Sequence, residues 1–493
     1  MSKLCKYDDR NNVLRIRKGV LRKLFLNRLP SALALLGAQL CSVSVAAAKP
    51  ASHGEAAAQS IELAKQLISI RSVSGPGNRT GEAQELIKRT LLAAGWRPED
   101  VDIQPVDDTA YLIATWPGSD PRLKPLVISG HLDVVDAKPS DWQRDPFTPI
   151  VENGFLYGRG SLDMKFDAAL ATSSLIEMRR AGYRPRRTII LQFSGDEETT
   201  AKTSRIIADR LKHADMVINI DASTGTYDEN GGKPLYWTWN GAEKTYNDFQ
   251  VEITNPGGHS SEPRADNAIV QLATAIAKIG VYRFKPELNA VTKAYWEKAA
   301  ALQGDPKVAA AMRAFAANPA DINAAEILRA NPATIGMVST TCVPTMVAGG
   351  HVENALPQRA TANVNCRIFP GHKRSEILAE LEKVVDQKEV KITDVTGDNW
   401  IASVNVPIRT DFVEAVEKAM HLARPGVAII PSQASGGSDS LWYRALGVPS
   451  YGAPPLFIKA SDNYMHGLNE RVPLDNVIPS LIYFASLFTQ LSK

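Results

Sequence analysis

The 493-residue chain lacks the features that mark several large classes of protein. It has only four cysteines, two of which, Cys5 and Cys41, lie in its first 48 residues, so a dense disulfide framework is excluded. Cys342 and Cys366 remain, and the sequence leaves open whether they pair in an oxidising compartment or stay as two buried thiols. No internal repeat is present, which excludes a fold built from stacked repeats.

The chain also lacks a surplus of basic residues once its N-terminal segment is set aside. The formal net charge is +3, but the first 48 residues hold nine Lys and Arg against two Asp. Taking these from the totals of 56 and 53 leaves 47 basic and 51 acidic side chains, a net charge of −4. No basic patch therefore indicates a nucleic-acid partner.

A long uninterrupted apolar run is absent too. The most apolar stretch, residues 29–48, is broken by Pro30 and Gly37, so it would make a weak membrane-spanning helix. Basic residues precede this stretch and Ala46-Ala47-Ala48 ends it, which is typical of a cleaved export signal. We expect residues 1–48 to be removed, with the mature protein periplasmic or secreted and without stable membrane insertion.

The chain is longer than one hydrophobic core usually supports, so two domains are expected. In the first part, compact apolar runs alternate with helical patterns. Strands are predicted at 126–129, 188–193 and 216–220, and helices at 166–182 and 204–212. This alternation predicts an α/β fold with a doubly wound, mostly parallel sheet covered on both faces.

The pattern changes near residue 244. Strands at 249–253, 334–340, 360–369 and 390–392 and helices at 267–279 and 375–386 give a β-α-β-β-α-β order, interrupted by a helical insertion at 284–333. The first type of pattern returns with a helix at 410–421. We therefore predict a catalytic domain of residues 49–244 and 397–493, with an α+β domain of residues 245–396 inserted within it.

Five short segments, far apart in the chain, contain residue types that bind zinc. The candidate ligands are His131, Asp163, Glu198, Asp221 and His466, and Glu197 is a spare carboxylate beside Glu198. Three of these segments come just past predicted strands, and the carboxyl ends of such strands converge on one crevice. Two His and three carboxylates suit a pair of divalent ions that share one carboxylate and a water.

Adjacent carboxylates at Glu197 and Glu198 point in different directions. One can bind metal while the other takes a proton from the bridging water as general base. Asp133, two residues after His131, can accept the other imidazole N–H and so fix its tautomer.

Together these motifs resemble the co-catalytic zinc peptidase family of glutamate carboxypeptidase, acetylornithine deacetylase, succinyl-diaminopimelate desuccinylase and aminoacylase. The helical insertion is similar to that of the larger dipeptidase and carboxypeptidase S members. The resemblance implies that the inserted domain is a ferredoxin-like lid or dimerisation domain. It assigns Asp163 as the bridge, His131 and Asp221 to one ion, Glu198 and His466 to the other, Glu197 as general base and Asp133 as the partner of His131.

The resemblance also gives roles to four residues outside the metal motifs. His259 would stabilise the tetrahedral oxyanion, often from the neighbouring subunit, and Asn354 would contact substrate. Arg367 would bind a substrate carboxylate, with a buried salt bridge as the alternative. Ser438 lies in a loop expected near the substrate, with a helix N-cap as the alternative.

We therefore expect an exported hydrolase with two Zn²⁺, for which Co²⁺ or Mn²⁺ would substitute. Its substrate would be a small peptide cleaved next to a free C-terminal carboxylate, as in a carboxypeptidase or dipeptidase. An N-acyl amino-acid deacylase would use the same site and is the main alternative. An inactive binding module is a remote alternative, because every expected ligand is present. The lid domain would provide the contact of a homodimer.

Overall fold

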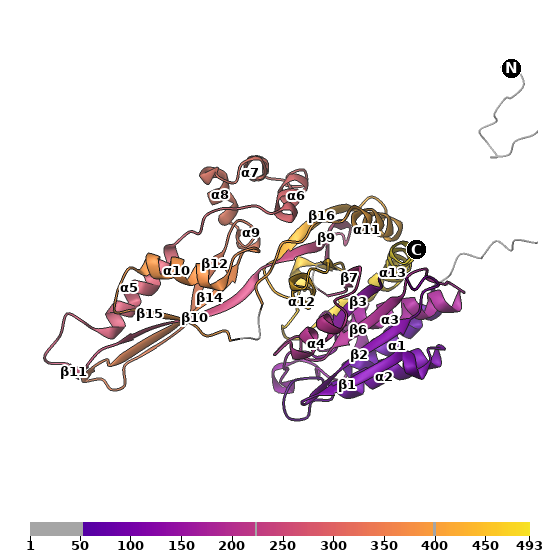
Figure 1. Ribbon diagram of the computed structural model, residues 1–493, viewed down its shortest axis with the longest axis horizontal. Coiled ribbons are helices and arrows are strands. Elements are labelled where there is room, and N and C mark those ends of the chain that lie inside the picture. The colour runs from indigo at the N-terminus through magenta and orange to yellow at the C-terminus, as the bar shows by residue number, and fades with distance from the viewer. Residues whose placement is uncertain (1–52, 222–223, 398–400) are drawn as a thin grey trace, which may run out of the picture. The chain divides into compact units, whose positions relative to one another are not determined.

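The computed structural model describes residues 53–221, 224–397 and 401–493 (Figure 1). The expected export signal at 1–48 lies outside the described residues. Within the described part of the chain, no helix is both long and apolar enough to cross a bilayer.

The described strands form a large central sheet in which parallel pairs occupy the middle. The order is β1-β2-β6-β3-β7-β17-β9-β8-β18, and β16 pairs with β9. The pairs β6–β3, β3–β7, β7–β17, β9–β16 and β8–β18 are parallel, whereas β1–β2, β2–β6, β17–β9 and β8–β9 are antiparallel. The strands are β1 Val101–Val106, β2 Thr109–Trp116, β3 Leu126–His131, β6 Ile189–Ser194, β7 Met216–Asn219, β8 Gly225–Tyr227, β9 Pro234–Glu243, β16 Ala428–Ala434, β17 Ser450–Gly452 and β18 Phe457–Lys459.

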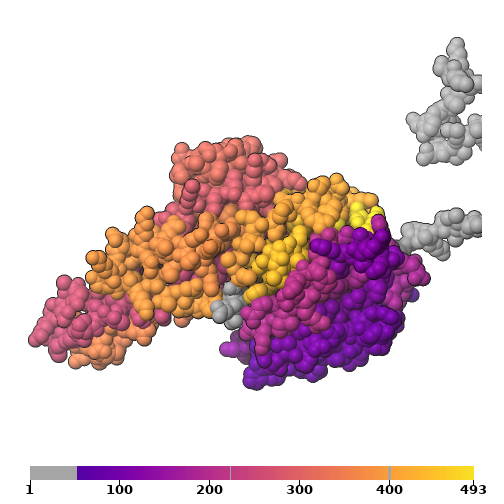
Figure 2. All heavy atoms as spheres, viewed as in Figure 1, coloured from indigo at the N-terminus to yellow at the C-terminus, as the bar shows by residue number. Residues whose placement is uncertain are grey.

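Helices cover both faces of this sheet, as the doubly wound prediction requires. Along β3, Leu126 and Ile128 belong to one hydrophobic cluster and Val127 belongs to another, because successive strand side chains point to opposite faces. The larger cluster holds α1 Gly54–Ile68, α2 Thr80–Ala93, α3 Lys165–Arg180, α11 Thr410–Ala423 and α13 Val477–Leu491. The smaller cluster holds α4 Lys202–Arg210 and α12 Ser440–Ala445. In the space-filling view the yellow C-terminal residues lie against magenta residues (Figure 2), as the pairing of β17 with β7 requires.

A second sheet has four antiparallel strands in the order β12-β14-β10-β15 and is covered on one face by two helices, which is a ferredoxin-like arrangement. Its elements are β10 Thr245–Thr254, α5 Ala268–Val281, β12 Thr341–Gly349, β14 Arg359–Ile368, α10 Arg374–Val385 and β15 Lys391–Asp394. Burial alternates along β10, with Phe249, Val251 and Ile253 facing the helices. The expected α+β fold is confirmed, and the division of the chain into domains at 245 and 396 stays a prediction.

The predicted strand at 334–340 is wrong. A short helix, α9 Pro332–Ile335, takes up its first residues, and β12 begins only at Thr341. The Asn331 side chain accepts a hydrogen bond from the Ala333 N–H, and Pro332 occupies the first helical turn, where its missing N–H costs nothing.

The helical insertion has a core of its own, built around Trp296 and Phe315. It comprises α6 Ala290–Ala299, α7 Pro306–Ala317, α8 Ile322–Arg329 and α9. Pro306 is the first residue of α7, a position at which proline is favoured. The insertion also contacts the central sheet, because Asn289 Nδ2 donates to Gln433 Oε1 on β16 at 2.6 Å.

Smaller elements connect these parts. A three-stranded sheet has the order β19-β5-β4, and a short two-stranded sheet joins β11 to β13. The bounds are β4 Ile150–Glu152, β5 Phe155–Tyr157, β11 Gly258–His259, β13 Ala355–Leu356 and β19 Arg471–Pro473, with 3₁₀ helices η1 Pro98–Asp100, η2 Pro139–Asp141, η3 Ala460–Asp462 and η4 Leu474–Asn476.

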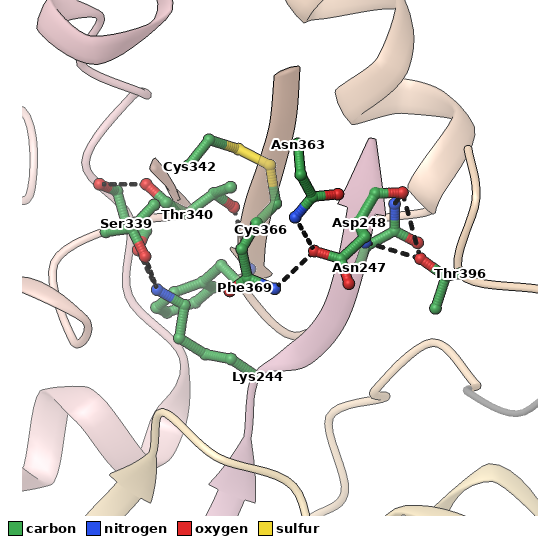
Figure 3. The surroundings of a disulfide bond; sticks show 12 residues. Lys244, Asn247, Asp248, Ser339, Thr340, Cys342, Asn363, Cys366, Phe369 and Thr396 are labelled. Atoms are coloured by element: carbon green, nitrogen blue, oxygen red, sulfur yellow. Dashed lines mark hydrogen bonds between the residues drawn. A yellow bond between two sulfur atoms is a disulfide. The ribbon is translucent and has the colours of Figure 1, made fainter. Parts of the chain in front are cut away.

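Cys342 and Cys366 form a disulfide, so the alternative of two free thiols is wrong. The two residues are directly opposite each other on β12 and β14 (Figure 3). Near this bond, Lys244 Nζ, at the junction of β9 and β10, donates to the Ser339 carbonyl at 2.9 Å. The disulfide thus fastens the edge strand β12 to the centre of the four-stranded sheet.

Candidate metal centre

The five predicted ligands meet at one edge of the central sheet. His131 is the last residue of β3, Glu198 follows β6, and Asp221 follows β7. These three strands are neighbours and parallel, so their carboxyl ends open on the same side. Asp163 comes from the loop before α3, and His466 from the loop before β19.

Asp163 lies between two histidines. His131 Nε2 is 3.0 Å from Asp163 Oδ1 and 3.9 Å from Asp221 Oδ2. His466 Nε2 is 3.0 Å from Asp163 Oδ2 and 3.0 Å from Glu198 Oε1. Each carboxylate oxygen of Asp163 therefore faces a different imidazole. Each imidazole also lies near a second carboxylate, that of Asp221 for His131 and that of Glu198 for His466. We call these the His131 half-site (His131, Asp221) and the His466 half-site (His466, Glu198).

The charge balance of this cluster favours cations. Donor atoms of His131, Asp163 and Glu198 all lie within 4.8 Å of one another, a spacing that could hold a metal ion. Burial raises the pKa of Asp221 to about 8, and the charge of Asp163 adds to the effect. Hydrogen bonds with Asp163 and Glu198 raise the pKa of His466 to about 10. Carboxylates crowded in this way repel one another, and divalent ions bound by imidazole and carboxylate would relieve the repulsion.

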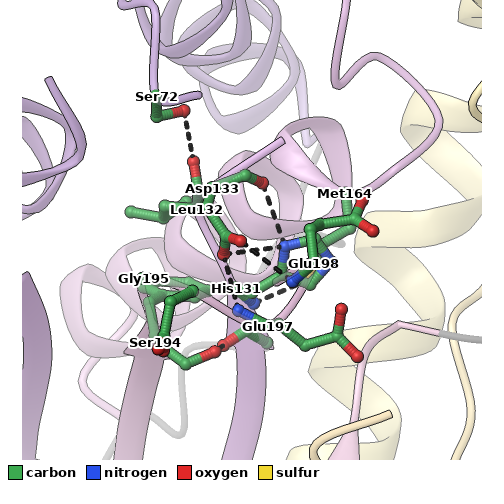
Figure 4. Close-up of polar contacts among 12 residues, drawn as sticks. Ser72, His131, Leu132, Asp133, Met164, Ser194, Gly195, Glu197 and Glu198 are labelled. Atoms are coloured by element: carbon green, nitrogen blue, oxygen red, sulfur yellow. Dashed lines mark hydrogen bonds and ion pairs between the residues drawn. The ribbon is translucent and has the colours of Figure 1, made fainter. Parts of the chain in front are cut away.

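Asp133 organises two of the loops at this edge (Figure 4). Its carboxylate accepts the backbone N–H groups of Glu197, at 3.2 Å, and Glu198, at 3.0 Å. His131 Nδ1 lies 3.0 Å from the Asp133 carbonyl oxygen and 3.4 Å from its Oδ1. Asp133 therefore contacts the far side of the His131 ring, as expected, and in addition holds the turn that carries both glutamates.

The two glutamates differ in their contacts. The Glu198 carboxylate meets His466, whereas among the described residues none hydrogen-bonds the carboxylate of Glu197. Burial raises the pKa of Glu197 well above its usual value. This difference agrees with the predicted division into one ligand and one proton acceptor, and the roles themselves stay predictions.

Three buried carboxylates that support the centre were not predicted. Asp196 accepts the backbone N–H groups of Lys202, at 2.8 Å, and Thr203, at 2.9 Å, and so closes the loop between β6 and α4. Lys202 and Thr203 follow Asp196 by six and seven residues, which matches no usual helix-cap pattern, so the sequence does not indicate this role of Asp196.

The other two lie in the C-terminal part of the chain. Asp439 accepts a hydrogen bond from Ser194 Oγ at 2.8 Å, and burial raises the pKa of Asp439 to about 6. Glu470 is fully buried and accepts the backbone N–H of Asp163 at 3.2 Å. Its place four residues after His466 is the only sequence signal that could have drawn attention to it.

His259 and Asn354 lie beside each other at the small two-stranded sheet of β11 and β13, although almost a hundred residues separate them in the chain. His259 of β11 pairs with Ala355 of β13, and Ser260 N donates to the Asn354 carbonyl at 3.0 Å. His259 is exposed, and its Nδ1 lies 2.6 Å from Ser261 Oγ. The structure thus brings these two predicted residues together, and the hydrogen bonds that the described residues make with the His259 ring come from the nearby Ser261.

Arg367 lies near the end of β14, at the opposite end of that strand from β13. It donates to the Ser435 carbonyl at 3.3 Å, and its guanidinium lies 4.8 Å from the centre of the Tyr246 ring. Among the described residues no carboxylate lies within 4.0 Å of the guanidinium, although the charge of Asp248 acts on it from farther away, so the salt-bridge alternative stays open. Its role toward substrate stays a prediction.

Ser438 is buried in a polar network. Its hydroxyl donates to Glu243 Oε1 at 2.6 Å and accepts from Asn219 Nδ2 at 3.0 Å. It also accepts from the Ser440 N–H at 3.2 Å at the start of α12, although the N-cap residue of that helix is Asp439 and not Ser438. These contacts explain Ser438 through the local structure, and its expected substrate contact stays a prediction.

Comparison with known proteins agrees with this geometry. Residues 127–490 match the model of "Peptidase family M20/M25/M40". The chain is 27% identical to the N-fatty-acyl-amino acid synthase/hydrolase PM20D1.1 of Danio rerio over 384 residues, which are 75% of this chain and 73% of the relative. It is 24% identical to the probable carboxypeptidase S-like 2 of Dictyostelium discoideum over 394 residues, 78% of this chain and 74% of the relative.

A solved structure shows the same fold. The metallo-carboxypeptidase Sso-CP2 of Sulfolobus solfataricus superposes with a TM-score of 0.64 at 17% identity, covering 87% of this chain and 98% of that one. Since the family model spans well over half of the sequence, the chain belongs to peptidase family M20/M25/M40, whose members are hydrolases.

Proposed function

We propose that the protein is an exported two-zinc metallopeptidase that hydrolyses peptide bonds, of carboxypeptidase or dipeptidase type. The observation that carries the proposal is the position of Asp163, with one carboxylate oxygen toward His131 and the other toward His466. A carboxylate shared in this way, with further ligands on either side, is what a pair of ions requires. Zinc is proposed because imidazole and carboxylate are its usual ligands.

In the proposed reaction the protein's residues divide the work. When bound, the two ions polarise the scissile carbonyl and lower the pKa of the attacking water. Glu197 accepts the proton of that water at its carboxylate and then donates it to the leaving amine, so that amide and water become a carboxylic acid and an amine. The Asp133 carboxylate keeps Glu197 in place by accepting a hydrogen bond from the Glu197 backbone N–H. His259, of this chain or of a second subunit, would donate to the oxyanion.

Arg367 is the proposed contact of the substrate's free carboxylate. Its guanidinium is partly buried, and burial lowers its pKa, but the group stays charged because an arginine is not deprotonated in proteins. Its hydrogen-bond acceptor among the described residues is a neutral carbonyl, that of Ser435. A planar cation with a neutral acceptor is suited to bind a carboxylate through two parallel hydrogen bonds.

An N-acyl amino-acid hydrolase is the second candidate. It is favoured by the relative from Danio rerio, whose name describes an N-fatty-acyl-amino acid synthase/hydrolase. Both reactions cleave an amide whose product is an amino acid with a free carboxylate, so the metal centre and Arg367 would serve either. The residues of the pocket that contact the acyl group, or the N-terminal part of a peptide, would decide which of the two substrates is cleaved.

Export and self-association are further parts of the proposal. The Cys342–Cys366 disulfide supports an oxidising compartment, where such bonds persist. The edge strand β12 exposes Val343, Met346 and Val347, and such an edge supports pairing with a second copy through the lid domain.

A substrate panel tests the proposal. The mature protein, treated with a chelator and reloaded with zinc, would be assayed on dipeptides, longer peptides, C-terminally amidated peptides and N-acyl amino acids. We expect no hydrolysis after chelation, recovery with zinc or cobalt, and cleavage of peptides with a free C-terminus. Faster turnover of N-acyl amino acids than of any peptide would favour the second candidate. Full activity without metal would overturn the metal centre itself.

A further inference from the structure

Glu470 joins two loops that each carry a metal ligand. Its side chain is fully buried. Oε1 accepts the backbone N–H groups of Leu162, at 2.6 Å, and Asp163, at 3.2 Å, while Oε2 accepts that of Gly160, at 3.1 Å. Glu470 itself belongs to the loop of His466. The Glu470 carboxylate, which lies in the loop of His466, thus binds the loop of Asp163, the carboxylate between the two half-sites.

Arg159 completes the connection. Its Nη1 donates to Glu470 Oε2, and its Nη2 donates to the carbonyl of Gly467, next to His466, at 3.1 Å. Both partners of this ion pair are buried, with 3% of the Arg159 side chain exposed and none of Glu470. The guanidinium also lies 5.1 Å from the centre of the Trp142 ring. Arg159, in the loop of Asp163, therefore binds the loop of His466 at two residues, Glu470 and Gly467.

The main chain aligns the two loops but does not reach the ligands. Strands β5 and β19 pair in antiparallel register, and Gly158 N donates to the Glu470 carbonyl at 3.0 Å. Beyond Gly158 the strand pairing ends, and three N–H groups of the following loop, those of Gly160, Leu162 and Asp163, donate to the Glu470 carboxylate instead. The spacing between Asp163 and His466 thus depends on this side chain.

We propose that Glu470 and Arg159 are positioning residues of the His466 half-site, an inference that rests on the proposed metal centre. Neither residue would bind metal. They would fix the 3.0 Å approach of His466 Nε2 to Asp163 Oδ2 before an ion arrives. The His131 half-site would depend less on them, because His131 and Asp221 are held by strands of the central sheet. Partners that orient ligands in this way commonly change metal affinity by about 10- to 100-fold.

The geometry predicts that a neutral amide cannot replace Glu470. In the hydrogen bonds that the described residues make with the Glu470 carboxylate, every partner is a donor: three backbone N–H groups and Arg159. In Glu470→Gln the amide NH₂ would face a donor in either orientation. At least one buried backbone N–H or the guanidinium would lose its acceptor, and the Asp163 loop would shift.

Zinc titration of the metal-free mature protein against a competing fluorescent chelator tests the proposal. The wild-type protein should bind two equivalents. Glu470→Gln should bind one with nearly unchanged affinity and the other about 10- to 100-fold more weakly. Glu243→Gln is the matched control, because Glu243 is equally buried and paired with Arg444 at 3.2 Å but contacts none of the predicted metal ligands. It should lose stability without changing either zinc affinity.

The outcomes separate the two proposals. A wild-type protein that does not bind two equivalents would refute the metal centre on which the inference rests. Two unchanged affinities in Glu470→Gln, or an equal loss at both, would refute the positioning role alone. Arg159→Lys provides a second test if Glu470→Gln does not fold. Lysine keeps the charge but cannot contact Glu470 and Gly467 with the same fixed fork, so the same equivalent should weaken, and an unchanged titration would again refute the role.

Discussion

Glu197 and Glu198 offer a sharp test, because they are adjacent in sequence and their proposed roles differ. Glu197→Gln keeps the shape of the side chain and removes the proton acceptor. The backbone N–H of residue 197 would still donate to Asp133, so the turn should keep its place. Glu198→Gln instead replaces a carboxylate oxygen that lies 3.0 Å from His466 Nε2.

The expected magnitudes follow from these contacts. General base catalysis contributes roughly 10²- to 10⁴-fold to a rate, so Glu197→Gln should raise the activation barrier by about 3–5 kcal/mol. Zinc content should stay at two equivalents, because no predicted ligand is lost. Glu198→Gln should weaken one zinc equivalent, and part of its activity should return in excess zinc.

The assay pairs steady-state hydrolysis of a peptide substrate with metal analysis of the same samples. Near-normal kcat in Glu197→Gln with two zinc ions bound would refute the base assignment. Loss of zinc from Glu197→Gln together with retained zinc in Glu198→Gln would show that the two roles are exchanged. The two variants control for each other, since both neutralise one carboxylate at the same edge of the sheet.

Three further predictions concern the lid. Cys342→Ser with Cys366→Ser should lower the free energy of unfolding by up to about 3.5 kcal/mol, the closure entropy of the loop between them, and an unchanged urea midpoint would contradict this. Arg367→Lys should raise KM about 10-fold for peptides with a free C-terminus but not for amidated ones, and an equal change for both would remove Arg367 from carboxylate binding. Val347→Lys, at a side chain with 69% of its surface exposed, should convert a dimer to a monomer in light scattering with a change in stability below about 0.5 kcal/mol, and an unaltered dimer would exclude β12 as the contact.

Local sequence patterns predict the central part of the catalytic sheet and little of its other half. Strands β3, β6 and β7 are short apolar runs buried on both faces, and each ends on a polar motif. The strands around β9 give no comparable signal. β9 pairs with β16, which lies beyond the inserted lid, and with the short strand β8. Pairings of that kind depend on the tertiary fold, which a local pattern does not contain.

The same distinction applies within the metal centre. The convergence of the predicted ligands could be foreseen, because imidazole and carboxylate groups at the ends of neighbouring parallel strands come together, as those of His131, Asp221 and Glu198 do. Glu470 is not predictable in this way. In the sequence it is one acidic residue in a polar loop, and a solvated side chain would be the ordinary interpretation. Only the fold shows that it is buried and surrounded by donors. When the buried Glu470 carboxylate is removed, no water is present to accept the hydrogen bonds of the Asp163 loop. The loss should therefore lower the affinity for the metal.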